Sequence, residues 1–187
     1  MHALADLYPF APGSLASAGD APALYGRYPQ YREVLDWIDA FITRPDPRVG
    51  RAGAVCPRVA PALERGLVRL VAVPVTASSA AEAAEKGTRL PGLFREVFPG
   101  PEEARAGALL AVFPGLAPHQ AKEFIDGGHA ALRAWFTSAG LMLGEFHPGS
   151  TVAAVRNPGF PVMRCPVPLW AVRAISVHDL MFLDRTG

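Results

Sequence analysis

The chain has 187 residues, of which 50% are hydrophobic and 19% charged, and its formal net charge is +1. This length suffices for one domain with a buried core, and the apolar content excludes a disordered chain. The balanced charge excludes nucleic-acid or membrane-surface binding that rests on overall charge. No apolar run approaches the roughly 18 residues of a membrane span, and the start, MHALADLYPFAPGS, lacks the regions of a signal peptide. We expect a cytoplasmic protein with a small-molecule substrate and no nucleic-acid or membrane partner; a homodimer is left open.

The first part of the chain combines an arm, a helix and an irregular stretch. Residues 1–28 are rich in Ala, Gly, Pro and Ser and predict a loosely docked N-terminal arm, followed by a single domain over residues 29–187. Apolar residues at helical spacing from Tyr31 to Ile42 predict an amphipathic helix that ends before Pro45. The next segment, RPDPRVGRAGAVCPRVAPAL, has too much Pro and Gly for regular structure until a short helix near residues 61–65, and such stretches are often functional.

The remainder predicts strands that alternate with helices. Apolar, β-branched segments predict four strands, at residues 67–75, 107–115, 141–149 and 167–175. Helices are expected at residues 78–97 with a break at 89–92, at 117–139, and from Ser176 through Leu183. This order predicts an α+β or α/β fold, a single domain with a sheet of about four strands backed by helices.

The third expected strand carries the most informative side chains. Alternation places Leu141, Leu143, Glu145 and His147 on one face. An apolar face that ends in a carboxylate and an imidazole is typical of a core that opens into a pocket. Glu145 and His147 would then act as acid and base, or His147 would ligate a metal while Glu145 orients it. The alternative is a strand end at the surface, where Pro148–Gly149 only makes the turn.

His129 is the second candidate. It lies on the apolar stripe of the longest expected helix, which it shares with Ile125, Leu132 and Phe136. Its imidazole therefore points toward the core, either as a ligand or as a histidine that hydrogen-bonds a carbonyl. Gly127 and Gly128 precede it, although each glycine costs a helix about 1 kcal/mol relative to alanine. The pair indicates the close approach of a flat cofactor, or else a kink in the helix.

Cysteines and arginines supply further candidates. Each cysteine is followed by proline, as in Cys-Pro haem-binding motifs. Cys56 is a candidate ligand or reactive thiol, whereas Cys165 is expected at a strand edge in the core. Arg156 and Arg164 precede the last strand, where they would clamp a carboxylate such as a haem propionate, or lie solvated in a loop. No C-x-x-C, nucleotide-binding, hydrolase or metalloprotease motif appears.

Three longer blocks stand out, namely AVCPRVAPALERG, FIDGGHAALRAWFTSAGLMLGEFHPG and RNPGFPVMRCPVPLWAVRAISVHDLMFLD. They resemble a bacterial domain family of unknown function with the signature V-C-P-F-V-P-x-A-L, G-L-M-L-G-E-F-H-P-G and N-P-x-F-R-P-x-R-S-P-x-P, over residues 33–184. Arg58, Ala60 and Cys165 depart from it. A more distant similarity, carried by Cys56 and Arg156–Asn157, is to the YqcI/YcgG family. That family includes haem proteins that hydroxylate an amino-acid nitrogen, so the similarity implies haem.

These features predict a haem-dependent oxidoreductase of specialised metabolism that oxidises an amino-acid-like or amine substrate, for example at nitrogen. His147 or His129 would be the axial iron ligand, and Glu145 would shuttle protons. The other cofactor-binding residues would be Arg156, Arg164, Cys56, Gly127 and Gly128. Two alternatives stay open. One is a cofactor-free acid–base enzyme (an isomerase, cyclase or dehydratase) that uses Glu145 and His147, and the other is a non-catalytic small-molecule binding protein.

Overall fold

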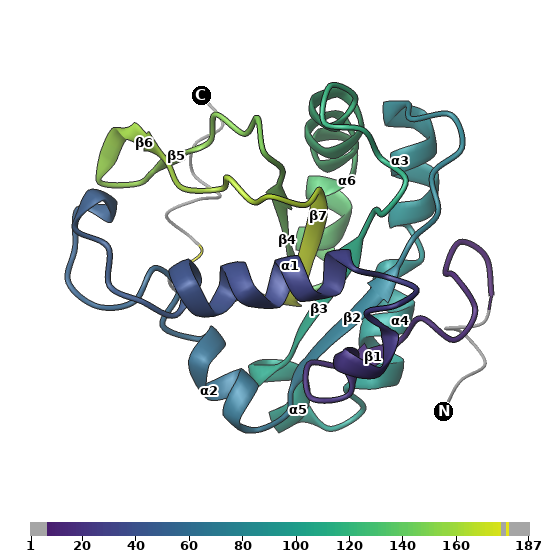
Figure 1. The fold of residues 1–187 in the computed structure, drawn as a ribbon, viewed down its shortest axis with the longest axis horizontal. Helices are drawn as coiled ribbons and strands as arrows, with labels where there is room; N and C mark the ends of the chain where they lie inside the picture. The colour runs from purple at the N-terminus through teal and green to yellow at the C-terminus, as the bar shows by residue number, and fades with distance from the viewer. Residues whose placement is uncertain (1–6, 177–178, 180–187) are drawn as a thin grey trace.

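The computed structural model describes residues 7–176 and residue 179. Its strands span, in chain order, Ala16–Ser17 (β1), Val68–Ala72 (β2), Ala108–Val112 (β3), Leu141–Phe146 (β4), Ala153–Ala154 (β5), Asn157–Pro161 (β6) and Leu169–Ala174 (β7). Five of them form a mixed sheet in the order β1-β2-β3-β7-β4 (Figure 1). Within it β2 and β3 are parallel and the other neighbours are antiparallel. β5 and β6 form a separate antiparallel pair.

Helical segments connect these strands. They span Ala21–Leu24 (η1), Gln30–Trp37 (α1), Ile38–Ile42 (η2), Pro47–Val49 (η3), Val59–Glu64 (α2), Ala80–Gly87 (α3), Leu90–Val97 (α4), Pro101–Ala106 (α5), Lys122–Asp126 (η4) and Gly127–Ser138 (α6). η1 and η3 are 3-10 turns, whereas η2 and η4 are π-helical. α1 therefore continues into a π-helical turn, and α6 follows one directly.

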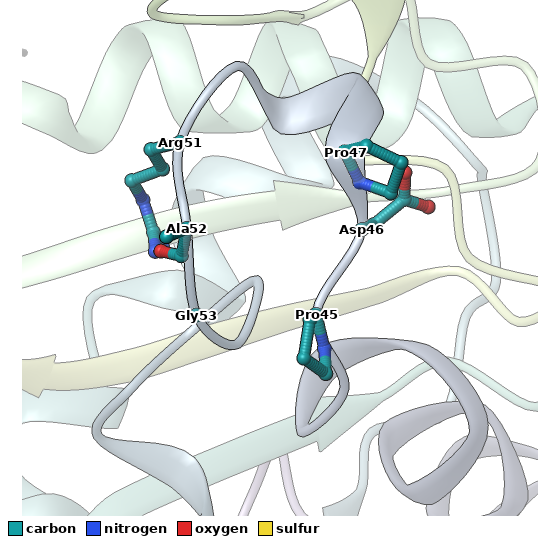
Figure 2. A pocket seen from close by; sticks show the side chains of 6 residues that line it. All are labelled: Pro45, Asp46, Pro47, Arg51, Ala52 and Gly53. Atoms are coloured by element: carbon teal, nitrogen blue, oxygen red, sulfur yellow. The ribbon is translucent and has the colours of Figure 1, made fainter.

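The loop between η2 and α2 folds back on itself. Pro45 and Ala54 form an isolated bridge, and the two limbs face each other across a depression of about 470 Å³ (Figure 2). Arg51 spans one limb, because its guanidinium donates to the carbonyls of Ala52 and Val55. The irregular stretch expected from its Pro and Gly content is thus held by its own hydrogen bonds.

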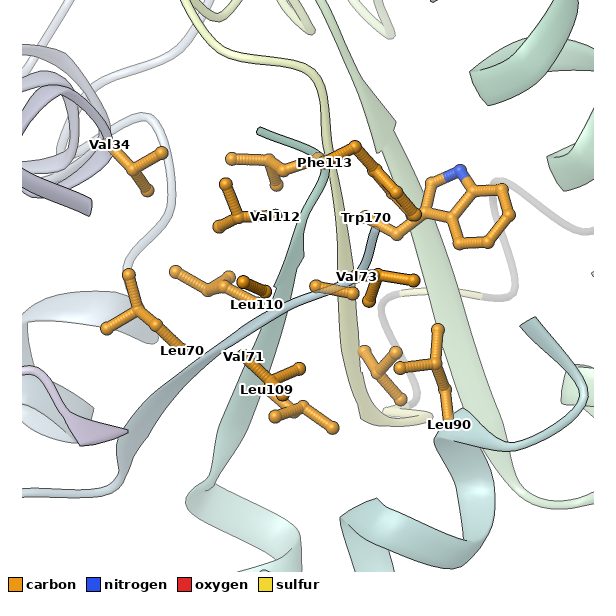
Figure 3. Close-up of a cluster of buried hydrophobic side chains, with 14 of the residues drawn as sticks. Val34, Leu70, Val71, Val73, Leu90, Leu109, Leu110, Val112, Phe113 and Trp170 are labelled. Carbon is orange, nitrogen blue, oxygen red and sulfur yellow. The ribbon is translucent and has the colours of Figure 1, made fainter. Parts of the chain in front are cut away.

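Apolar side chains fill both faces of the sheet (Figure 3). Leu70 and Leu110 project toward Val34 of α1, and Trp170 lies on the opposite side with Leu90 of α4. All five side chains are buried. Because the central strands are apolar on both faces, the sheet lies between two helical layers. The expected α+β fold with a single domain is confirmed.

The predicted elements agree with the structure in type and differ in extent. All four expected strands are present in the sheet, and the helix expected at 78–97 is divided into α3 and α4. The helix expected at 117–139 begins later, at the π-helical turn η4. The sequence did not indicate α5, β5 or β6. The helix expected from Ser176 lies largely outside the described residues.

Residues 7–28, which precede α1, pack on the sheet. Phe10, Ala11, Ala16 and Ala21 are buried in the core, and β1 pairs with β2. This differs from the loosely docked arm that the composition of residues 1–28 predicts. Ser14 contributes to the docking, because its hydroxyl accepts a hydrogen bond from the backbone N–H of Ala72. In the part of the chain that the structure describes, no helix combines the length and apolar character needed to cross a membrane.

Candidate functional site

The candidate site lies where the end of β4 faces η4 and α6. Leu141 and Leu143 begin this face of β4 and are buried, and Glu145 and His147 end it. Both polar side chains contact residues of the facing helix, so they share one face as the alternation predicts. They do not pair with each other, however. Instead, the Glu145 carboxyl contacts an imidazole of the facing helix, and the His147 imidazole contacts a carboxyl of that helix.

The first contact joins Glu145 to His129. His129 Nε2 lies 3.0 Å from Glu145 Oε2, and the two side chains are only 18% and 15% exposed. Burial raises the pKa of the Glu145 carboxyl to about 7, with a smaller contribution from the negative charge of Asp126. Burial also lowers the pKa of the His129 imidazole, against a hydrogen bond to the backbone of Leu143 that raises it. Near neutral pH the pair therefore holds a carboxyl that readily gains or loses a proton beside a neutral imidazole.

The second contact joins His147 to Asp126. His147 Nε2 lies 3.0 Å from Asp126 Oδ1, and the His147 side chain is 1% exposed. The other carboxylate oxygen of Asp126 accepts from Lys122 Nζ at 3.2 Å. His147 Nδ1 is buried without a hydrogen-bond partner in the structure. His147 is thus held at one nitrogen by a half-buried carboxylate.

The π-helical turn brings both helical partners to β4. Asp126 ends η4, and His129 lies in the first turn of α6, three residues later. The indole Nε1 of Trp170 donates to the carbonyl of Ile125 at 3.2 Å. π-helical turns inside α-helices are often found at functional sites. Here the turn is fixed from the sheet side by a buried ring.

The glycine pair before His129 has a packing role. A Cβ at Gly127 would lie 2.8 Å from the Cβ of Ala80, and a Cβ at Gly128 would lie 2.6 Å from that of Ala83 and 2.7 Å from the ring of Trp170. The space beside both glycines is filled by α3 and by Trp170. The groups that closely approach the two glycines are therefore side chains of the protein itself, and they leave no room there for a flat cofactor.

The other predicted cofactor-binding residues lie in different contacts. The Cys56 backbone N–H donates to the carbonyl of Ile42, and both cysteines are free. Arg156 is exposed and packs by its backbone and Cβ against Gly50. Arg164 Nε donates to the carbonyl of Ser150, in the turn after His147. Among the described residues, no hydrogen bond or ion pair joins Cys56 or Arg156 to Glu145. Cys165 is buried in the core as expected, and it precedes β7 in the chain.

The histidines fit poorly as haem or metal ligands. His129 Nε2 faces a carboxyl group, His147 Nε2 faces another, and the free nitrogen of His147 is fully buried. Within residues 7–176 and 179, no group of three or more His, Cys, Asp and Glu side chains is placed to hold a metal ion. To ligate haem iron through Nε2, either histidine would have to turn its ring away from its carboxyl partner.

A shallow depression reaches the site from the helix side. It measures about 590 Å³ and is lined by Ala80, His119, Lys122, Glu123, Asp126 and Gly127. Asp126, whose side chain is 28% exposed, belongs both to this depression and to the contact with His147. Sequence reasoning missed Asp126. Its position three residues before His129, on the same side of a helix, was the available signal.

The family of the chain follows from comparison with known proteins. A family model described as a domain of unknown function (DUF6875) matches residues 31–187. The chain belongs to this family. No curated protein and no solved structure matches the chain. Membership of DUF6875 agrees with the resemblance to a domain family of unknown function, and the similarity to the YqcI/YcgG family stays a prediction.

Proposed function

We propose that this protein is an enzyme that uses Glu145 and His129 for general acid–base catalysis on a small-molecule substrate. The observation that carries the proposal is the 3.0 Å contact between the two side chains, each more than four-fifths buried. A buried carboxyl whose pKa lies near 7 costs stability and is typical of functional sites. The reaction class is that of an isomerase, cyclase or dehydratase, and the enzyme acts in the cytoplasm.

The chemistry follows from the proton affinities of the two groups. Because the pKa of Glu145 is about 7, both its acid and its carboxylate are populated near neutral pH. The carboxylate accepts a proton from a C–H or O–H of the substrate, and the acid returns one to another atom. His129, neutral because burial lowers its pKa, accepts or relays that proton at Nε2. No external oxidant or reductant is consumed, which matches isomerisation, cyclisation or loss of water.

This assignment modifies the acid–base alternative that the sequence left open. The sequence pairs Glu145 with His147, but the structure gives Glu145 a different imidazole, that of His129. His147 instead contacts Asp126 and is too buried to meet a substrate without movement. The alternative of a non-catalytic binding protein offers no reason for placing a carboxyl and an imidazole together in a desolvated setting.

Proton transfer can be tested before the substrate is known. The protein is incubated in D2O with a mixture of polar metabolites, and mass spectrometry follows deuterium incorporation into each. We expect at least one metabolite to gain deuterium, with a rate that falls about 100-fold or more in Glu145→Gln and in His129→Asn. Glu64→Gln is the matched control, because Glu64 is exposed at the end of α2 and does not line the depression that reaches the site. Exchange that is absent, or equal in all four proteins, would refute the proposal.

One further measurement on the same proteins distinguishes haem chemistry from acid–base catalysis. Protein expressed with a haem precursor is examined by absorption spectroscopy. A stoichiometric Soret band that is lost in His147→Ala or His129→Ala would replace acid–base catalysis with haem chemistry. A colourless protein that still exchanges deuterium would support the proposal.

A further inference from the structure

The two carboxyl–imidazole contacts form a pair of rungs between one helix and one strand. Asp126 and His129 are three residues apart on the helix, and Glu145 and His147 are two apart on the strand. The earlier helical residue contacts the later strand residue, as in an antiparallel arrangement. Each rung joins one carboxyl group to one imidazole, at 3.0 Å in both cases.

The dimensions of the two elements make the rungs interdependent. Three residues of helix span about 4.5 Å and two residues of strand about 6.6 Å. A slide of the helix by one residue, or its rotation by about 100°, would therefore break both contacts together. The His147 side chain cannot adjust to such a movement, because it is 1% exposed and is held at the end of β4.

We propose that Asp126 is a positioning residue, which through His147 fixes the start of α6 so that His129 meets Glu145. This inference rests on the proposed function in one respect, the catalytic role of the His129–Glu145 contact. His147 supports Asp126 from the sheet, and the carbonyl of His147 is itself held by the backbone N–H groups of Ser150 and Cys165. The anchor is therefore built into the turn that follows β4.

Electrostatics at the site are consistent with this role. The negative charge of Asp126 raises the pKa of Glu145 and of His129, and the positive charge of Arg133 lowers both. Lys122 neutralises part of the Asp126 charge from the solvent side, where its side chain is 74% exposed. On β7, the residue opposite Glu145 is Trp170, which carries no charge. Asp126 thus influences the catalytic pair by its charge as well as by its position.

The test observes the imidazole nitrogens of the free protein by long-range proton–nitrogen NMR. In Asp126→Ala we expect the His129 nitrogen signals to move toward those of the exposed His119, because His129 loses its fixed place beside Glu145. In Asp126→Asn, whose amide oxygen still accepts from His147 Nε2, the His129 signals should stay as in the natural protein. Glu123→Ala is the matched control, because Glu123 is an exposed carboxylate on the same π-helical turn.

The outcomes separate the two proposals. Unchanged His129 signals in Asp126→Ala would overturn the positioning role, even if deuterium exchange is observed. Displaced signals in Asp126→Ala, restored in Asp126→Asn, would support it even if no metabolite exchanges deuterium. Where exchange is measurable, Asp126→Ala should lower its rate about 100-fold, the cost of misplacing a catalytic group by about 1 Å. If Asp126→Ala does not fold, Asp126→Ser, which is too short to reach His147, takes its place with the same criteria.

Discussion

Glu145 and Trp170 are directly opposite each other in the ladder between β4 and β7. Side chains of paired residues lie on the same face and close together, and Trp170 is fully buried. The carboxyl of Glu145 therefore borders a large apolar ring on one side and the helix on the other. This explains why burial is the main cause of its raised pKa, and it implies that the ionised form is destabilised by the fold.

The raised pKa of Glu145 predicts how stability depends on pH. The folded protein keeps this proton up to about pH 7, whereas the unfolded chain loses it near 4.5. Stability is therefore lost as pH rises from about 4.5 to 7, by at most about 3 kcal/mol. Glu145→Gln, which resembles the protonated acid, should raise the free energy of unfolding at pH 8 and leave it nearly unchanged at pH 4.5.

Urea unfolding of the natural protein and Glu145→Gln at the two pH values measures this difference. Glu64→Gln serves as the control, because Glu64 is exposed at the end of α2 and should give the same small change at both. A Glu145→Gln variant that is less stable at pH 8 than the natural protein would show that Glu145 is ionised in a stabilising contact.

The strand side of the site could be predicted from sequence, but the helix side could not. A strand alternates with a period of two, so the shared face of Glu145 and His147 follows from spacing alone. The partners depend on how α6 is rotated against β4. That rotation is set by the π-helical turn that ends at Asp126. Such a turn contains one extra residue, which cannot be recognised from the 3.6-residue period of apolar side chains in the sequence.

The glycine pair shows the same limit of sequence reasoning. Gly127 and Gly128 do indicate close approach, as the sequence predicts, but the approaching group is set by tertiary packing. Likewise, residues 7–28 show no apolar periodicity, because isolated residues such as Phe10 pack into the core and no regular helix or strand face does. Amino-acid composition can indicate that a segment has no regular helix or strand, but it cannot predict whether that segment packs against the core.

Gly128→Ala should destabilise the protein. The new methyl group would meet Ala83 and Trp170 at less than 3 Å, and overpacking of this kind costs about 1–3 kcal/mol. Gly92 is the matched control, since it also lies inside a helix, α4, and a Cβ there meets nothing within 4 Å. Gly92→Ala should therefore stabilise the protein by about 0.5–1 kcal/mol. Thermal or urea unfolding that gives the two variants the same sign would contradict this assignment.

The Glu82–Lys86 ion pair is buried and holds the loop between β2 and α3. Glu82 accepts hydrogen bonds from the backbone N–H groups of Thr76, Ala77 and Ser78, and Lys86 Nζ lies 2.6 Å from its carboxylate. These bonds lower the pKa of Glu82 to about 2, against burial. Lys86→Met removes the cation beside this buried carboxylate and leaves it only its hydrogen bonds, so it should cost about 3 kcal/mol, the lower end for breaking a buried ion pair.

Guanidinium unfolding at pH 7 measures that cost. The control is Asp36→Asn, which breaks the exposed pair of Arg32 and Asp36 and should change stability by less than about 1 kcal/mol. In the natural protein, the contribution of Glu82 should be lost as pH falls from about 4.5 toward 2, since the unfolded carboxylate is protonated first. A Lys86→Met protein as stable as Asp36→Asn would show that the pair does not hold the loop.

The two thiols should differ in reactivity. Cys56 is half-buried in the loop before α2, whereas Cys165 is 2% exposed and burial raises the pKa of its thiol to about 12. Because the thiolate is the reactive form, we expect one equivalent of a disulfide reagent to react in the folded protein and a second only after denaturation. Cys56→Ser should abolish the first reaction. If the folded Cys56→Ser protein still reacts quickly, Cys165 is accessible and the packing around the start of β7 is looser than its burial indicates.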